Sequence, residues 1–398
     1  MAEHVVILAG GRGERFWPRS TPTVPKQFIR LFGQRTLLQE ALQRARALVP
    51  EERIWVSSAA EYEALLRDQL PPALVARRLI LEPVRRDTAA GIGWAALHLL
   101  AADPEAVLVM MPADHYLSDL DPFALAVDRA VQAARRGALV TLGIRPSRPE
   151  TGYGYIHLGG PLGAVEGAYR VDRFVEKPDT ETALRFLEEG SYLWNSGIFV
   201  WQARSILEAI GRRLPTLREG LERAWEAPPE ERAALFAGLP AISIDFGVMQ
   251  DEARLGGDVA VVPGRFTWDD VGSWAALDRL TEADERGNRV WGEGLALAAT
   301  GCTLHNEEAG HMLIAFGTQD LLTVHTPRVT VVAPKARAAD WKELLAALRR
   351  QGYGRLVDDV GERPPAENPA PEAGAPWGAA PTAPAAGRAA PGAGAGRP

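Results

Sequence analysis

Cysteine is almost missing from this chain, which has one, Cys302, in 398 residues. An internal disulfide bond is therefore excluded, and so is a metal site built from several cysteines. The seven histidines are scattered and no two form an H-x-x-x-H pair, which excludes the helical zinc motif. No apolar run approaches the roughly 20 residues of a membrane-spanning helix. The first residues, MAEHVVILAGG, lack a signal peptide's basic region and cleavage site. These absences favour a cytoplasmic protein without a membrane-bound part.

Lysine is scarce as well. Of the 44 basic residues, lysine occupies only positions 26, 177, 335 and 342, which leaves 40 arginines. A planar guanidinium and a compact ammonium are not interchangeable. We therefore expect that Lys26 and Lys177, which lie in the short strings PKQ and EKP, are required as ammonium groups. The alternative is that both are ordinary surface lysines.

An excess of positive charge is also absent, because the net charge is −7. This balance argues against nucleic acid as a partner, and any bound anion must be met by a local group of cations. The hydrophobic content of 46% is sufficient for the core of one large domain and a smaller one.

Apolar segments alternate with helical patterns through the first 142 residues. We expect helices at residues 36–49, 60–68, 87–102 and 121–136, the last with an Asp cap, and strands at 4–9, 53–58, 78–82, 106–111 and 139–142. Each strand is continuously apolar, so the pattern predicts an α/β fold with a mostly parallel sheet and helices on both faces.

Polar groups follow three of these strands. The glycine-rich residues 10–13 follow the first strand, Glu82 ends the third, and Asp114 and His115 follow the fourth. Sites in such sheets gather at the carboxyl ends of the strands. We therefore expect the three groups to converge at one edge of the sheet.

The pattern changes after residue 150. We expect two strands within residues 151–178, a helix at 180–190, helices within 203–237, and strand-plus-turn segments at 242–249 and 265–274. Past residue 284 the chain is predicted to form short strands that end in a helix at 338–350. Residues 361–398 are rich in Pro, Ala and Gly and cannot bury enough surface to offset the entropy of ordering, so we expect a disordered tail.

The segment ILAGGRGERFWPRSTPTVPKQF, residues 7–28, combines glycines with cations. Its glycines can adopt backbone angles closed to other residues. Exposed amides near positive side chains form an anion site, most often for phosphate. The residues concerned are Gly10, Gly11, Gly13, Arg12, Arg15, Arg19 and Lys26.

Three glycine-rich loops were compared with this segment. A P-loop is excluded, because no glycine of the chain precedes a lysine. A dinucleotide-binding loop is disfavoured, because Phe16 replaces the third glycine and Pro18 and Pro22 follow where a helix should run. A nucleotidyltransferase loop, which wraps a triphosphate with amides and adds Arg and Lys, fits along the whole segment.

Further strings extend this similarity: EP…DTAAG, MPADH, RPETGYGYI, FVEKP, WNSGIFVW, SIDFGVM and WDDVGSW. Together they resemble the bacterial mannose-1-phosphate guanylyltransferases over about residues 4–275, and more weakly to about 350. The resemblance implies transfer of GMP from GTP to mannose 1-phosphate, which gives GDP-mannose and pyrophosphate. It also implies a Rossmann-like nucleotidyltransferase domain at 1–283, a small left-handed β-helix at 284–360, and the tail. The β-rich region could pack on the same chain or form a homodimer contact.

This reaction needs charge neutralisation more than proton transfer. The attacking phosphate is already ionised, since its second pKa is about 6, so the lack of a Ser-His or Cys-His pair is expected. The resemblance implies that Arg15 and Lys26 hold the β- and γ-phosphates, that Lys177 meets the sugar phosphate or the α-phosphate, and that Asp114 and Asp270 bind Mg²⁺. The implied nucleotide site is Leu8, Ala9, Gly10, Gly11, Gly13, Glu82, Asp87, Thr88 and Ala89. The implied sugar-phosphate site is Tyr153, Gly154, Glu176, Asn195 and Asp245.

Alternatives remain for several of these residues. Asp114 could cap a helix, Asp269 could replace Asp270 as the ligand, and His115 could indicate a transition-metal site. Tyr153 could serve turn packing. Arg12 and Arg19 could be solvated, and Trp194, Phe199 and Trp201 could belong to the core.

One position departs from the family pattern. Relatives usually carry Asn-Thr-Ala-Pro after the EP motif, where this chain has Asp87-Thr88-Ala89-Ala90. Base preference is therefore less certain than the type of reaction. The competing functions are a nucleotidyltransferase for another NTP and hexose 1-phosphate, and a non-catalytic nucleotide-sugar sensor of the same fold.

Overall fold

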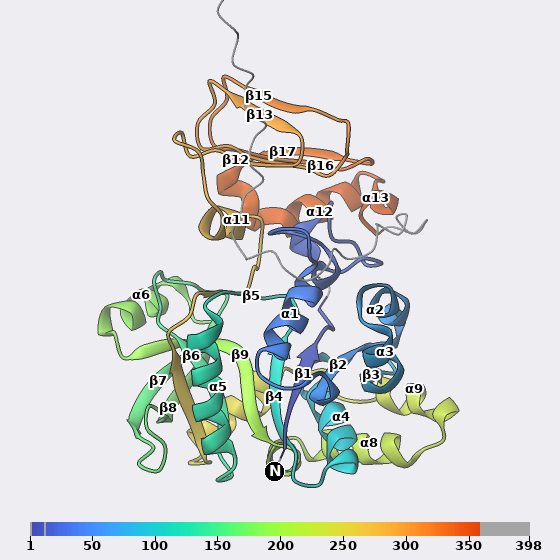
Figure 1. Cartoon of the computed structure of the whole chain (residues 1–398), viewed down its shortest axis with the longest axis vertical. Coiled ribbons are helices and arrows are strands. Elements are labelled where there is room, and N and C mark those ends of the chain that lie inside the picture. The colour runs from blue at the N-terminus through green and yellow to red at the C-terminus, as the bar shows by residue number, and fades with distance from the viewer. Residues whose placement is uncertain (1, 12, 359–398) are drawn as a thin grey trace, which may run out of the picture. The chain divides into compact units, whose positions relative to one another are not determined.

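A computed structural model describes residues 2–11 and 13–358. Arg12 and the predicted disordered tail at 361–398 lie outside the described residues. Within the described part, a nine-stranded sheet has the order β3-β2-β1-β4-β9-β6-β10-β8-β7 (Figure 1). Its strands are β1 Glu3–Leu8, β2 Ile54–Ala59, β3 Leu79–Glu82, β4 Val107–Pro112, β6 Leu139–Ile144, β7 Gly154–Pro161, β8 Tyr169–Glu176, β9 Tyr192–Gln202 and β10 Val259–Gly264.

The sheet is mixed. Strands β1 to β4 form parallel pairs, and β6 and β10 form another. Strand β9 lies between β4 and β6 and is antiparallel to both, and it also pairs antiparallel with β7. The prediction of a mostly parallel sheet is thus correct for the first strands and misses the central reversal. An apolar strand buried on both faces has the same pattern in either direction.

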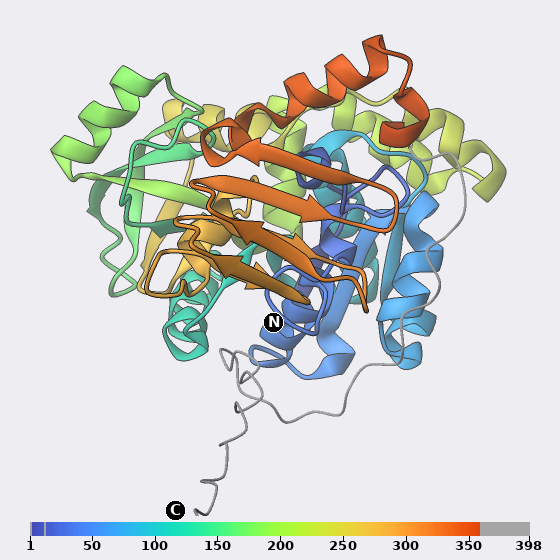
Figure 2. The ribbon, with the colours of Figure 1, turned by 90° about the horizontal axis from the view of Figure 1, so that it is seen from above.

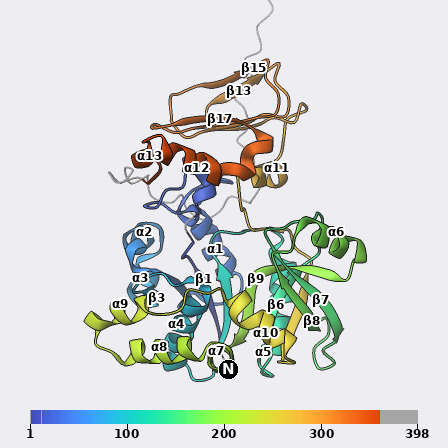
Figure 3. The ribbon, with the colours of Figure 1, turned by 180° about the vertical axis from the view of Figure 1, so that it is seen from behind.

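Helices cover both faces of the sheet, as predicted. The side chains of β1 alternate between two cores: Val5 and Ile7 belong to one and Val6 to the other. The first core includes residues of α1 and α5, and the second includes residues of α4, α7 and α8; Figures 1 and 3 are opposite views of this arrangement. The helices are α1 Leu37–Arg46, α2 Glu63–Gln69, α3 Pro72–Arg78, α4 Asp87–Ala102, α5 Leu120–Ala134, α6 Thr180–Glu189, α7 Ala203–Arg213, α8 Pro215–Glu226, α9 Pro229–Ala237 and α10 Gln250–Arg254.

Local predictions vary in accuracy. Helix α4 has the predicted bounds, and Thr36 begins α1 with a reciprocal capping box to Gln39. The Asp cap expected for α5 is wrong, because Asp119 precedes that helix without a side-chain capping bond. The strand-plus-turn expected at 242–249 is also wrong, since Asp245–Met249 forms a π-helical turn that continues into α10. Short apolar runs cannot be assigned to strand or helix by periodicity alone.

The C-terminal strands stack as short coils. Strands β12 Arg289–Trp291, β14 Thr303–Asn306 and β16 Leu321–His325 pair in parallel, and β13 Gly294–Leu297 pairs in parallel with β15 Leu313–Phe316. Strand β17 Thr330–Pro334 adds antiparallel to β16, and Figure 2 shows the strands side by side. The chain alternates between the two sheets from β12 to β16. Helices α11 Ala275–Leu280, α12 Trp341–Arg350 and α13 Gly354–Asp358 flank them.

The loop after β1 packs against this region. The carbonyl of Trp17 accepts hydrogen bonds from the indoles of Trp274 (3.2 Å) and Trp341 (2.6 Å). Leu322 and Val324 of β16 belong to the same apolar cluster. The glycine-rich segment is therefore held by residues about 250 to 325 positions away. Within the part of the chain that the structure describes, no helix is long and apolar enough to cross a membrane.

Candidate active site

The glycine loop leaves the carboxyl end of β1 and approaches the segment after β4. Gly13 has a φ of 62°, and a Cβ there would lie 2.2 Å from Cβ of Lys26. Gly11 faces the Asp114 carboxylate, its added Cβ being 3.7 Å from Oδ2, while Gly10 has open space around it. Of these three glycines, only Gly13 uses the left-handed backbone that the sequence suggested for all of them.

Lys26 is buried, with 4% of its surface exposed, and its ammonium has three partners. Nζ lies 2.8 Å from Oδ2 of Asp114, and it donates to the carbonyls of Asp270 (2.8 Å) and Val271 (3.1 Å). An ammonium has three hydrogens to direct at three acceptors, whereas a guanidinium is a planar fork. This geometry supports the expectation that position 26 needs a lysine. It also shows that Lys26 binds protein groups of two segments, at Asp114 and at Asp270 and Val271. The sequence analysis expected Lys26 to hold phosphate and did not predict these contacts.

Asp114 lies where the strand, the glycine loop and Lys26 meet. Burial would raise the pKa of its carboxyl, but the charge and hydrogen bond of Lys26 outweigh burial and hold that pKa below the usual value. Asp114 caps no helix, because the next helix begins at Leu120. Its Oδ1 lies 3.9 Å from Nε2 of His115. The carboxylate is therefore ionised at neutral pH.

The neighbouring carboxylates Asp269 and Asp270 have different environments. Asp269 is 2% exposed and accepts two hydrogen bonds from Arg279, of 2.9 and 3.0 Å. It also accepts one from the backbone N–H of Val271. Asp270 is half-buried, and its Oδ1 accepts a 2.7 Å hydrogen bond from the Tyr153 hydroxyl. Asp269 is thus committed to holding the loop, which favours Asp270 as the ligand.

Val271 carries backbone strain beside this site. Its φ is 50°, a left-handed conformation that is rare for a β-branched residue. Asp269 holds its N–H at 2.8 Å and Lys26 holds its carbonyl at 3.1 Å. These two bonds maintain a turn that directs the Asp270 carbonyl toward Lys26.

Tyr153 contacts a candidate metal ligand, because its hydroxyl donates to the Asp270 carboxylate. It is 6% exposed and packs edge-on against Trp194 and Trp268, with ring centroids 5.2 and 5.1 Å away. Burial and the nearby carboxylate of Asp270 raise the pKa of its hydroxyl. Arg148 donates to that hydroxyl at 3.1 Å.

A second group of predicted residues meets around Gly154. A Cβ on Gly154 would lie 2.5 Å from the Glu176 carboxylate and 3.4 Å from Cβ of Asn195. The Asn195 amide donates to Asp245 at 2.6 Å and accepts from the Thr141 hydroxyl at 2.8 Å. Four of the five predicted sugar-site residues, namely Gly154, Glu176, Asn195 and Asp245, therefore lie together.

The charges of this second group are coupled. Burial and the neighbouring Glu176 carboxylate raise the pKa of Asp245 to about 6. Lys177 is exposed, has a left-handed backbone with φ 49°, and pairs with Glu176 at 2.9 Å. The hydrogen bond and charge of Glu176, together with Asp245 and Asp87, raise the pKa of Lys177. An exposed cation thus lies at the rim of a polar, acidic group of side chains.

The residues expected at the nucleotide base lie at the start of α4. Asp87 has φ 62° and binds the N–H of Thr88 with its own carboxylate. The Thr88 hydroxyl accepts from the N–H of Ile244, and the Ala89 N–H donates to the Ile242 carbonyl. The backbone donor of Ala89 is therefore already used. These bonds connect the start of α4 to the segment that carries Asp245.

Glu82 ends β3 and is nearly buried. Burial raises the pKa of its carboxyl to about 7, although Arg85 lowers it. A Cβ on Gly91 would lie 2.8 Å from its Oε1, so the helix approaches this carboxyl closely. Leu8 ends β1 and Ala9 follows it, and the Ala9 carbonyl accepts from Gln27 (2.8 Å) and Ser58 (2.7 Å).

The remaining alternatives are partly resolved. Trp194, Phe199 and Trp201 are core residues. No cluster of three metal-binding side chains includes His115 in the described ranges, and Trp268 donates to its Nδ1 at 3.3 Å. Arg15 is exposed, whereas Arg19 pairs with Glu307 of the C-terminal coils at 2.6 Å.

Three positioning residues were missed by sequence reasoning: Arg148, Arg279 and Thr141. Arg148 begins the string RPETGYGYI, so a signal was present there. Arg279 and Thr141 lie in ordinary helical and strand patterns, where their partners could not be inferred.

The predicted site residues thus form two adjoining groups. In the first group, the Lys26 ammonium joins the Asp114 carboxylate to the backbone carbonyl of Asp270, whose own carboxylate binds Tyr153. In the second group, Gly154, Glu176, Asn195 and Asp245 offer directional hydrogen bonds. Carboxylates beside a glycine loop suit a divalent cation with phosphates. Side-chain amides and carboxylates suit a polyhydroxylated ligand.

Comparison with known proteins agrees with this chemistry. The family model described as nucleotidyl transferase matches residues 4–287. A mannose-1-phosphate guanylyltransferase of Klebsiella pneumoniae is 36% identical over 353 residues, which are 87% of this chain and 74% of that protein. The xanthan biosynthesis protein XanB of Xanthomonas campestris is 36% identical over 355 residues, which are 87% of this chain and 73% of that protein.

A solved structure is also similar. A crystal structure from Thermus thermophilus, described as a mannose-1-phosphate geranyltransferase, is 38% identical with a TM-score of 0.79. The match covers 88% of this chain and all of that one. The glycine loop, the carboxylates at the strand ends and these similarities lead to one conclusion: the chain belongs to the nucleotidyl transferase family.

Proposed function

We propose that the protein transfers GMP from GTP to mannose 1-phosphate and so forms GDP-mannose and pyrophosphate. The observation that carries this proposal is the arrangement of Asp114 and Asp270 around Lys26 at the glycine loop. The names of relatives that are 35–36% identical over 87% of the chain support the choice of substrates.

The reaction is a displacement at phosphorus. An oxygen of mannose 1-phosphate attacks the α-phosphorus of GTP, the bond from that phosphorus to the bridging oxygen breaks, and pyrophosphate leaves with the electron pair. No proton has to move, because the attacking phosphate is ionised. Catalysis therefore consists of holding the two anions in line and neutralising their charge.

Asp114 and Asp270 are the proposed ligands of Mg²⁺. Asp114 uses Oδ2 for Lys26, and Asp270 uses Oδ1 for Tyr153. Each carboxylate thus keeps a second oxygen, which fits an ion that takes one or two carboxylates plus phosphates and water. When bound, the ion would supply Lewis-acid neutralisation of the phosphates. Lys26 joins the two carboxylate-bearing segments through Asp114 Oδ2 and the Asp270 carbonyl.

The other residues bind the substrates. Arg15, which is exposed on the loop, would hold the leaving pyrophosphate, and Lys177 would receive the phosphate of the sugar. Asn195, Glu176 and Asp245 accept and donate hydrogen bonds to mannose hydroxyls. The nucleotide is enclosed by Leu8 to Gly11, Gly13, Glu82 and the start of α4, where Asp87 can accept from the N1–H and N2–H₂ of guanine.

Finer features of the chain belong to the same proposal. Residues 1–283 form the catalytic domain, and the coils of 284–360 form a left-handed β-helix, whose parallel stacking is consistent with this class. We further propose that the protein works in the cytoplasm and that the coils can provide a homodimer contact. Sedimentation of the purified chain tests the dimer directly.

A substrate matrix tests the proposed function. The protein is incubated with Mg²⁺, each of four NTPs and each of several hexose 1-phosphates, and released pyrophosphate is measured. GTP with mannose 1-phosphate is expected to give the highest kcat/KM. A preference for another pair would assign a different nucleotidyltransferase, and no turnover with any pair would favour a nucleotide-sugar sensor.

A further inference from the structure

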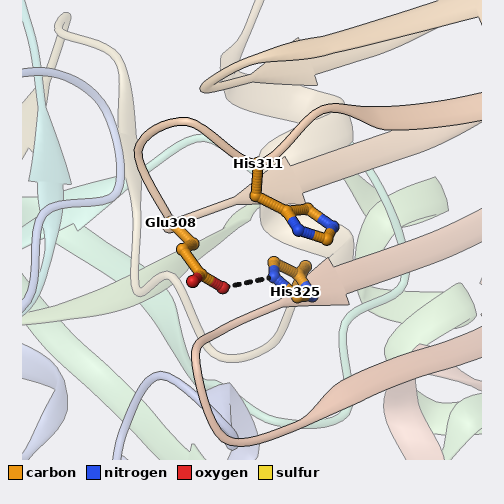
Figure 4. Close-up of side chains that lie close together, drawn as sticks. All are labelled: Glu308, His311 and His325. Carbon is orange, nitrogen blue, oxygen red and sulfur yellow. Dashed lines mark hydrogen bonds and ion pairs between the residues drawn. The ribbon is translucent and has the colours of Figure 1, made fainter.

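Three side chains of types that can bind transition metals meet in the C-terminal coils, outside the two groups of the candidate active site. Glu308 and His311 lie in the turn after β14, and His325 ends β16 (Figure 4). One ligand atom from each lies within 4.8 Å of the other two. Figure 4 shows the carboxylate of Glu308 and the two imidazoles directed into one space.

The three side chains of this group are already in contact with one another. Nε2 of His325 lies 3.0 Å from Oε2 of Glu308. The rings of His311 and His325 stack with centroids 4.0 Å apart and planes 13° from parallel. Neutral imidazole is the form that binds metals.

A second hydrogen bond orients His325. Its Nδ1 lies 2.8 Å from the Thr330 hydroxyl, which can accept the Nδ1 proton. Without an ion, Nε2–H donates to the Glu308 carboxylate, which can only accept. When the proton is on Nδ1 instead, the Nε2 lone pair is available to an ion in the space between the side chains. Metal-binding histidines characteristically donate the N–H of their other ring nitrogen to a hydrogen-bond acceptor. The side chain of His325 is only 11% exposed, so its orientation is also fixed by packing.

The turn that carries the other two ligands is held by Asn306. Its amide donates to the carbonyls of Glu293 (2.8 Å) and His311. Its Oδ1 accepts from the N–H of Glu308 at 3.1 Å. The backbone positions of Glu308 and His311 are thus set by one buried side chain. His311 itself is exposed and can turn toward an ion without disturbing the core.

We propose that Glu308, His311 and His325 form a binding site for a divalent transition metal, with Zn²⁺ the ion that the ligands fit best. Two imidazoles and one carboxylate with one open position form a common zinc ligand set. Zn–N and Zn–O distances are about 2.0–2.2 Å. An ion at these distances would therefore lie between His325 and Glu308 and replace their direct contact. His311 would also have to rotate away from its stacked position to reach the ion. The set differs from Asp114 and Asp270, whose oxygens suit Mg²⁺.

The site lies next to an ion pair that connects the C-terminal coils to the glycine-rich segment. Glu307 precedes Glu308 and pairs with Arg19 of the glycine-rich segment at 2.6 Å. Its N–H also donates to the His325 carbonyl at 3.1 Å. An ion that holds the turn therefore also holds Glu307 in its ion pair with Arg19. We expect such an ion to stabilise the folded chain.

Zinc binding to the chelator-treated full-length protein tests the proposal. Titration calorimetry is run in millimolar Mg²⁺, so that the carboxylate site is occupied by its own ion. One Zn²⁺ per chain is expected to bind, the thermal midpoint is expected to rise, and Co²⁺ is expected to give the visible absorption of a four-coordinate site. His311→Ala is expected to weaken binding at least about 10-fold and to remove both signals.

A matched control separates this site from adventitious binding. His157 is a half-buried histidine paired with Asp172 at 3.0 Å on another part of the chain, so His157→Ala should retain wild-type zinc binding. His311→Ala should also keep the wild-type rate of pyrophosphate release in Mg²⁺. Because His311 is exposed, this variant should fold, and Glu308→Gln provides an independent second variant. Binding that is absent, or equally strong in wild type and both variants, would overturn the proposal.

Discussion

Replacing Gly13 with alanine tests how the glycine loop and Lys26 depend on each other. The new Cβ would lie 2.2 Å from Cβ of Lys26, and also 3.0 Å from its backbone nitrogen. Rotation of the lysine side chain cannot relieve a contact with its own Cβ and backbone. Either the loop or the segment that carries Lys26 must therefore move.

The size of the effect follows from two costs. A left-handed backbone costs a residue with a Cβ roughly 1–2 kcal/mol. Ordinary carbon contacts are about 3.5–4.0 Å, so the chain must shift by more than about 1 Å, and overpacking of this kind costs about 1–3 kcal/mol. The sum is about 2–5 kcal/mol, which a domain with roughly 5–15 kcal/mol of stability can survive.

The functional effect is expected to exceed the effect on stability. The Lys26 ammonium reaches Asp114 and the Asp270 carbonyl at 2.8 Å each, and a shift of its backbone breaks this arrangement. A misplacement of about 1 Å can cost about 100-fold in rate. We therefore expect kcat of Gly13→Ala to fall about 100-fold, measured by pyrophosphate release, in a protein that still unfolds cooperatively in urea.

Two other glycines provide matched controls. Gly137 has a φ of 100° with nothing near its added Cβ, so Gly137→Ala isolates the backbone cost. Gly33 has neither a left-handed backbone nor a neighbour within 4 Å, so Gly33→Ala should be nearly neutral. If Gly13→Ala lost no more stability than Gly137→Ala and kept the wild-type kcat, the close approach of Gly13 to Lys26 would be refuted.

Substitutions at Lys26, Tyr153 and Glu82 test other parts of the account. Lys26→Arg should lower kcat about as much as Lys26→Ala, by roughly 100-fold, because a planar fork cannot serve three divergent acceptors; an active arginine variant would show that only charge matters. Tyr153→Phe removes a hydrogen bond to the Asp270 carboxylate worth about 1.5–3 kcal/mol and should lower kcat roughly 10–100-fold; an unchanged kcat would make Tyr153 a packing residue only. For Glu82, burial raises the folded-state pKa to about 7. As the pH rises, the Glu82 carboxyl therefore stays protonated in the native state after it has ionised in the unfolded chain. The free energy of unfolding of wild type should fall by about 3 kcal/mol between pH 4.5 and 7, and that of Glu82→Gln should not show this fall. Urea unfolding at both pH values checks this, and parallel pH profiles would contradict it.

The fold could be predicted where neighbouring residues along the chain determine the structure. The bounds of α4 and the apolar strands of the sheet follow from composition and periodicity, and the convergence of the glycine loop with Asp114 follows from parallel strand topology. The direction of β9 could not be predicted, because the mostly apolar pattern of WNSGIFVW is the same for a parallel and an antiparallel strand. The π-helical turn at Asp245–Met249 depends on tertiary packing around Gly247, whose added Cβ would lie 2.9 Å from Leu214.

Site residues could likewise be identified from local motifs, whereas their distant partners could not. The scarcity of lysine indicated that Lys26 was special, but its partners at Asp270 and Val271 are 244 and 245 positions away. Choosing between Asp269 and Asp270 required knowing that Arg279 occupies the first. Tyr153 was identified from its motif, yet its role depends on a hydrogen bond to Asp270 that no local pattern encodes.

The account's central claim is that Asp114, Asp270 and Lys26 support GMP transfer to mannose 1-phosphate. The most direct measurement is the rate of GDP-mannose formation from GTP, mannose 1-phosphate and Mg²⁺, detected by mass spectrometry, for wild type and Asp114→Asn. We predict GDP-mannose and pyrophosphate in equal amounts from wild type, and loss of product from a folded Asp114→Asn variant. No GDP-mannose from wild type, or an unchanged rate in Asp114→Asn, would contradict the account.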